Sequence, residues 1–235
     1  MPAKCSMVKH VEKEINVLRA EKELAGLAEK LIIYRFRVAL ANMTLTFAVI
    51  GAILAFALTL LFTVGPPRLP WIPAGLSGAV GLTAIIATFF AAAAVLHPVY
   101  EKSLRGLSRL IPGEEESLVK RLNAAPIVSY TVPFAIFYLV KPYPGWESHA
   151  WYFALTLASL TMYAMYERAL NSRVKGLRLR IYLVLTALMA VLSPLVVAAA
   201  SAWGVGGAVA VAVMAFLASS LIASLQEIYR AEREL

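Results

Sequence analysis

The chain has 235 residues, of which 60% are hydrophobic and 15% charged, and its mean hydropathy is +0.74. Soluble domains hold roughly 25% charged residues, so this composition excludes an ordinary soluble protein. The fourteen acidic residues are all glutamate and amides are few, a composition typical of a thermophile. The absence of aspartate excludes aspartyl intramembrane proteases and enzymes that hold magnesium with paired aspartates. Cys5 is the only cysteine, which excludes an intramolecular disulfide and a multi-cysteine metal site.

Residues 1–37 predict a charged cytoplasmic helix. They carry eight basic and five acidic residues and lack the apolar core and cleavage site of a signal peptide. Two apolar stripes follow helical spacing, one from Val8 to Leu18 and a displaced one from Leu24 to Leu31. Two interpretations stay open. The helix lies on the membrane surface or docks a partner, or it is a solvated extension of the helix that follows.

Six apolar runs follow, and each approaches or exceeds the roughly 20 residues that cross a hydrocarbon core of ~30 Å. We therefore expect an all-α, polytopic helical membrane protein with six transmembrane helices arranged as three hairpins. Proline-rich or glycine-containing turns with a tryptophan close the outer ends of these hairpins. The expected spans are 38–64, 74–99, 124–140, 149–166, 181–201 and 206–225.

The charged connections predict the orientation. Of the 22 Lys and Arg residues, 20 lie in the N-terminal segment 1–37, the hairpin 100–123, the basic loop 167–180 or the tail 226–235. Only Arg68 and Lys141 lie in the other connections. By the positive-inside rule, both termini and both charged loops are cytoplasmic, and the protein is a multi-pass protein of the cell membrane.

A weak internal repeat is visible where two of the expected spans end. The second is followed by Tyr100-Glu101, and the fourth ends with Tyr166-Glu167, 66 residues later. Duplication of a helical hairpin explains this spacing. Interfacial tyrosines and charges, which recur wherever helices leave a membrane, are the favoured explanation.

No Asp, Glu, Lys or Arg lies inside the six expected spans. This argues against a proton-coupled transporter, because such proteins use intramembrane ionisable residues. It does not argue against a permease that takes its energy from a cytoplasmic partner. Neither a cofactor nor a metal is expected, since His97 and His149 lie at opposite ends of their spans. Nucleic acid is not indicated, because the positive-inside rule accounts for the basic face.

Gly75-Leu76-Ser77-Gly78 and His149 lie at the predicted outer side. This pattern is similar to the rhomboid intramembrane serine proteases, which pair such a serine with a histidine within a six-helix core. The chain departs from that family because Ser77 is on the second span and the sixth span has no histidine. The architecture also looks like the permease halves of some ABC exporters, a likeness that no diagnostic residue carries.

Three functional hypotheses follow. The leading one is a non-enzymatic integral-membrane subunit of a transport or translocation assembly that docks a cytoplasmic partner, such as an ATPase. The second is a homo-oligomeric membrane pore, and the third is an intramembrane serine protease. The candidate residues for binding a partner or lipid are the charged ones of the two cytoplasmic loops: Arg105, Arg109, Glu114, Glu115, Glu116, Arg173, Lys175, Arg178 and Arg180.

Overall fold

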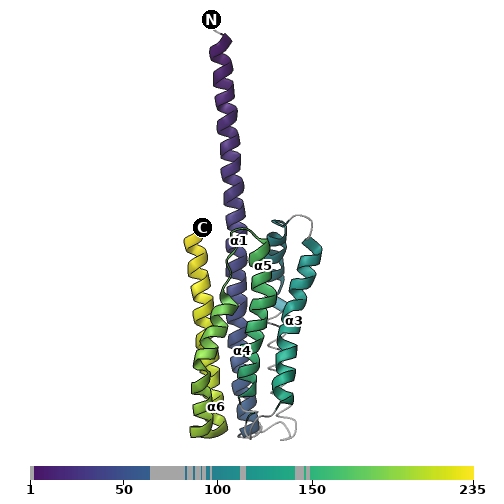
Figure 1. Ribbon diagram of the computed structural model, residues 1–235, viewed down its shortest axis with the longest axis vertical. Helices are drawn as coiled ribbons and strands as arrows, with labels where there is room; N and C mark the ends of the chain where they lie inside the picture. The colour runs from purple at the N-terminus through teal and green to yellow at the C-terminus, as the bar shows by residue number, and fades with distance from the viewer. Residues whose placement is uncertain are drawn as a thin grey trace, which may run out of the picture.

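The computed structural model is helical throughout the part of the chain that it describes, and no strand occurs in that part (Figure 1). The all-α class is confirmed to this extent. The run expected at 74–99 lies mostly outside the described residues, and Ser77 lies entirely outside them. The described residues are 3–63, 97–111, 115–140 and 149–235, with the single positions 83, 87, 91, 94, 95 and 146.

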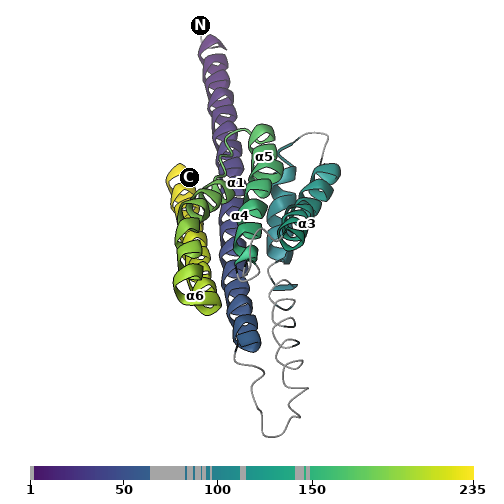
Figure 2. The ribbon, with the colours of Figure 1, turned by 60° about the horizontal axis from the view of Figure 1, so that its bottom comes forward.

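Helix α1 runs without interruption from Ala3 to Thr63 over 61 residues. Its sequence is rich in the strong helix formers Ala, Leu, Glu and Lys and contains no proline. The N-terminal half of α1 projects well beyond the other helices in both ribbon views (Figures 1 and 2). Residues 3–37 are therefore a straight extension of the apolar helix that follows them.

The middle of the chain forms a second helical pair. Helix α3 spans Glu115–Leu139, so the end of the expected hairpin 100–123 and the run 124–140 form a single helix. It packs along α4 (Ala150–Met162), which continues into the π-helical turn η2 (Tyr163–Glu167) and α5 (Arg168–Arg173). Trp146 lies in the α3–α4 connection. Its indole N–H donates to the carbonyl of Phe137 at 2.9 Å, and its ring stacks on Phe137.

Helix α6, Ile181–Glu234, consists of two arms joined at Gly204. The backbone of Gly204 has φ 66° and ψ −158°, a conformation essentially restricted to glycine. The chain reverses there, and the two arms lie beside each other in both views (Figures 1 and 2). The runs expected at 181–201 and 206–225 occupy one arm each.

The second arm of α6 packs antiparallel against α1. Gly51 of α1 lies against the Phe216 ring, and Lys30 of α1 donates to the carbonyl of the last residue, Leu235, at 3.3 Å. The N-terminus of α1 and the C-terminus of α6 therefore lie toward the same end of the bundle (Figure 1). Leu104, Leu107 and Leu170 of the main hydrophobic core are fully buried.

Two helical stretches of the described chain are long and apolar enough to cross a membrane: Leu18–Ile53 and Ile181–Glu234. Six such helices were expected. Part of the difference arises because both arms of α6 fall within one stretch. Neither α3 nor α4 qualifies as an individual helix, and α4 contains only 13 residues before the π-helical turn. Only 22% of the most apolar window of Ile181–Glu234 is buried, whereas the core helix of a soluble protein would be mostly buried.

Candidate functional site

A cluster of four charged residues joins α1 to the second arm of α6. Arg37 Nε donates to Glu227 Oε1 at 2.5 Å, and Arg37 Nη1 donates to Glu234. Arg230 Nη1 lies 3.5 Å from Glu227 Oε2, and Arg230 Nη2 lies 3.7 Å from Glu234 Oε1. The Arg37 and Glu227 side chains are only 2% and 1% exposed. Two cations and two anions balance each other, which offsets the large desolvation cost of burying a charge.

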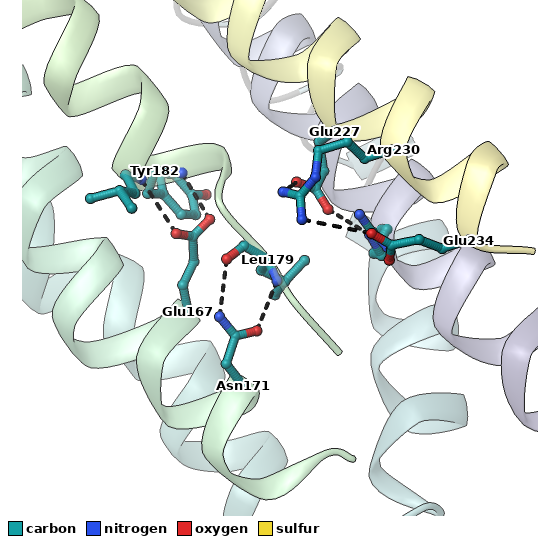
Figure 3. A network of polar contacts seen from close by, with 9 residues as sticks. Glu167, Asn171, Leu179, Tyr182, Glu227, Arg230 and Glu234 are labelled. Carbon is teal, nitrogen blue, oxygen red and sulfur yellow. Dashed lines mark hydrogen bonds and ion pairs between the residues drawn. The ribbon is translucent and has the colours of Figure 1, made fainter. Parts of the chain in front are cut away.

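Glu167 is a second buried carboxylate, on the π-helical turn η2 (Figure 3). Its Oε1 accepts the backbone N–H of Tyr182 at 2.8 Å and its Oε2 accepts that of Leu183 at 3.3 Å. Glu167 thereby satisfies two free donors at the start of α6, where the helix dipole also favours a negative charge. Arg180 has no side-chain capping bond there.

Burial raises the pKa of Glu167 to about 7, from an ordinary value near 4.5. The N–H bonds from Tyr182 and Leu183 act in the opposite direction, and the nearby charge of Glu227 raises the pKa further. A π-helical turn inside an α-helix is frequently found at a functional position. Glu167 is therefore a buried group that can gain or lose a proton near neutral pH.

Tyr100 and Tyr166 meet at the same end of the bundle. Their hydroxyls are hydrogen-bonded to each other, and both side chains are buried. Tyr166 also packs edge-on against Tyr182, with 6.4 Å between ring centroids. The tyrosines of the two Tyr-Glu motifs thus lie together, but the glutamates of the two motifs differ in burial. Glu101 is partly exposed and pairs with Arg105 at 2.6 Å, whereas Glu167 is buried.

Three further buried polar residues, all serines, precede Glu227 on the second arm of α6. Ser219, Ser220 and Ser224 are fully buried, and their hydroxyls have no hydrogen-bond partner in the described part of the chain. Other helical hydroxyls behave differently. Thr44, for example, donates to the carbonyl of Leu40 at 2.9 Å. Buried polar groups normally find a partner, so these three hydroxyls are exceptions among the described residues.

The loop between α5 and α6 borders an open pocket of about 510 Å³, which among the described residues is lined by 171–180. The amide of Asn171 bonds twice to Leu179, donating to its carbonyl at 3.0 Å and accepting its N–H at 2.8 Å (Figure 3). Val174, Leu177 and Leu179 are buried and anchor the loop in the core. The exposed charged side chains between and around these anchors are Arg173, Lys175, Arg178 and Arg180.

The structure therefore brings together only some of the candidate residues. Those of the basic loop share one pocket, and Arg105 and Arg109 are exposed on a different segment that does not line it. Glu115 and Glu116 begin α3, and Glu114 lies outside the described residues.

His149 is buried beside Trp146, with ring centroids 5.3 Å apart, in an edge-to-face contact. Its pairing with Ser77 involves a residue outside the described part of the chain.

Sequence reasoning missed Arg37, Glu167 and Glu227 as buried groups. Each lies just outside an expected span, where charged residues are ordinarily solvated. A signal was present for Glu227, because it shares one helical face with Ser220 and Ser224.

Comparison with known proteins gives no relative. No family model, no curated protein and no solved structure matches this chain.

Proposed function

We propose that this chain is a non-enzymatic integral-membrane subunit of a transport or translocation assembly, and that the projecting half of α1 docks a cytoplasmic protein. The observation that carries the proposal is the continuity of α1. One continuous helix joins the bundle to a segment that extends about 50 Å beyond Arg37, from the helical rise of 1.5 Å per residue. Leu24, Leu27 and Leu31 are 66%, 59% and 41% exposed on that segment.

A membrane location is supported by the outward-facing side chains. Large apolar residues are exposed along α3 and on both arms of α6, including Leu139 at 83%, Val191 at 74% and Met214 at 67%. Soluble monomers rarely expose contiguous apolar patches larger than a few hundred Å². We place six spans in the membrane, the two arms of α6 forming the last hairpin. The end of the bundle that holds Arg37 and the basic loop is then cytoplasmic, as the distribution of Lys and Arg requires.

The exposed leucines of α1 support the docking role. Leu24, Leu27 and Leu31 recur at the spacing of one helical face, and Glu29 lies on the opposite face. An amphipathic helix that stands clear of its own domain binds in an apolar groove of another protein. A helix that continues a membrane span in a straight line cannot lie flat on the membrane, so a protein is the better occupant of this face. A soluble ATPase is one partner that this arrangement suits.

Site-specific photo-crosslinking in native membranes tests the docking role. A photoreactive residue at position 27 faces the expected partner, and one at position 29 is the matched control on the opposite face. We expect a crosslink to one cytoplasmic protein from position 27 only. We also expect Leu24→Gln with Leu27→Gln to abolish co-purification of that protein. Equal crosslinking from both positions would contradict docking through this face.

A homo-oligomeric pore is the second candidate, and the buried serines of α6 favour it. Three hydroxyls on one arm of α6 have no partner among the described residues, and a pore needs polar groups within its helices. A crosslink from position 27 to a second copy of the chain, with solute flux through pure protein in liposomes, would select the pore. Absence of flux for a broad panel of ions and small solutes would count against it.

A further inference from the structure

The basic loop has a property that neither the membrane orientation nor the docking role requires. It forms an open pocket whose rim carries cationic side chains. Ten consecutive residues, 171–180, line its volume of about 510 Å³, which is within the range of small-ligand pockets. We propose that this loop binds a phosphate group, carried either by an anionic lipid headgroup or by a soluble phosphate compound.

Positive charge is concentrated in this loop. Arg173, Lys175, Arg178 and Arg180 are exposed, and the segment from 168 to 180 contains no acidic residue. The nearest acid in sequence, Glu167, is buried and engaged with the backbone of α6. The side chains of Lys175, Arg178 and Arg180 form no ion pair or hydrogen bond within the described part of the chain. Cations on neighbouring residues of one loop repel one another, and a bound anion reduces that repulsion.

The loop is also held in shape. Asn171 clamps Leu179 through two hydrogen bonds, and the N–H of Leu177 donates to the carbonyl of Val174 at 3.2 Å. Gly176 has φ 87°, which lets the chain turn between these anchors. A loop that served only to mark the cytoplasmic side would need charge but no fixed conformation. Pre-organised cations bind an anion at a lower entropic cost.

The residue types suit phosphate. Three of the four cations are arginines, whose planar guanidinium donates two parallel hydrogen bonds to phosphate oxygens. The loop also directly precedes Ile181, where the apolar arm of α6 begins. A headgroup phosphate at the membrane surface and a soluble phosphate compound would both reach this position. The two sources share the recognised group and differ in the molecule that carries it.

The test uses the full-length protein in nanodiscs of phosphatidylcholine. Native mass spectrometry would measure retention of added phosphatidylglycerol or phosphatidic acid, and calorimetry would measure binding of inorganic phosphate, pyrophosphate and ATP. The site variant is Lys175→Gln with Arg178→Gln and Arg180→Gln. The matched control, Lys102→Gln with Lys120→Gln and Arg121→Gln, removes the same charge from exposed positions on the other predicted cytoplasmic segment. A third variant, Asn171→Ala, leaves every charge in place.

We expect the site variant to weaken binding by at least about tenfold, the size of one lost charge-assisted hydrogen bond. Asn171→Ala should also weaken it, and the control variant should bind as the wild type does. Selective retention of the anionic lipids identifies a headgroup as the ligand, and binding of the soluble anions identifies a free phosphate compound. Equal losses in the site and control variants would mean that net charge alone attracts anions, and would overturn the proposal. Absence of binding to every probe would overturn it as well. Because the charge variants alter only exposed side chains, they decide the question even if Asn171→Ala fails to fold.

Discussion

Arg37 on α1 and Glu227 on α6 are 190 residues apart in sequence and form a hydrogen-bonded ion pair of 2.5 Å. The pair fixes the base of the projecting helix to the last arm of the bundle. Its energetic value comes less from attraction than from the cost of leaving either partner buried alone.

Removing one member of this pair should destabilise the protein strongly. Arg37→Leu leaves Glu227 buried with only Arg230 nearby, and we expect a loss of about 3–5 kcal/mol in the free energy of unfolding. Thermal unfolding in nanodiscs, followed by tryptophan fluorescence, measures the effect. Arg35→Leu is the matched control, because Arg35 is exposed two positions earlier on the same helix. A double variant, Arg37→Leu with Glu227→Leu, should recover part of the loss. Equal melting temperatures for Arg37→Leu and Arg35→Leu would refute the structural role.

The two tyrosine hydroxyls should be energetically coupled. Tyr100→Phe or Tyr166→Phe leaves the other hydroxyl buried without its partner, at a cost of about 1–3 kcal/mol. The double variant removes both hydroxyls and should be more stable than the sum of the single effects predicts. A double-mutant cycle on the melting temperatures measures the coupling. Strictly additive losses would mean that the two hydroxyls do not interact.

Glu167 should make stability depend on pH. Burial raises its pKa in the folded chain to about 7, against 4.5 for the ordinary carboxyl, so the folded state holds the proton more tightly. This contribution is complete below pH 4.5 and is lost as the pH rises through about 7, a change on the order of 3 kcal/mol. The charged and titratable groups that face Glu167 are Glu227, Tyr166 and Tyr182.

Glu167→Gln keeps an oxygen acceptor and stays neutral at every pH. Relative to wild type, its melting temperature should be higher at about pH 8 than at about pH 5. The comparison with wild type cancels the titration of the other carboxylates. A difference between the two proteins that does not change with pH would show that Glu167 keeps its charge throughout this range.

Gly204 should resist substitution, and its neighbour should not. Gly204→Ala places a Cβ on a residue with φ 66° and ψ −158°, at a cost of about 1–3 kcal/mol. Gly206→Ala meets no atom within 4 Å, and Gly206 lies inside a helix, so this change should be neutral or slightly stabilising. The difference in melting temperature between the two variants is the measurement. Equal stability would mean that the chain does not reverse at Gly204.

Much of the fold could be predicted from the sequence, because apolar runs and turn residues are local signals. The reversal at Gly204 is one example, since Trp203-Gly204 separates two apolar runs. The burial of Arg37 and Glu227 could not be predicted in this way. Both residues lie where an apolar run ends, and charges at such positions ordinarily face water or headgroups. They are buried because α1 and α6 extend past the expected spans and pack against each other there.

The candidate site was predicted in part. The basic loop was recognised from its charge alone, whereas its pocket depends on Asn171, a polar residue with no distinguishing signal in one sequence. The paired tyrosines were visible as a repeat, but recurrence at membrane interfaces was the favoured explanation of it. Tertiary packing makes the two Tyr-Glu motifs different. Glu101 is partly exposed, whereas Glu167 is buried at the start of α6.

The central claim is that the chain crosses the membrane several times with its projecting helix in the cytoplasm, and the single native cysteine tests it most directly. Cys5 lies in α1, and no other cysteine interferes. A membrane-impermeant maleimide applied to intact cells should leave Cys5 unlabelled, and permeabilisation should expose it to the reagent. In a Cys5→Ser background, Ser148→Cys should react with the same reagent without permeabilisation, because it lies in a predicted outer turn. Labelling of Cys5 from outside, or release of the protein from membranes by alkaline carbonate, would contradict the account.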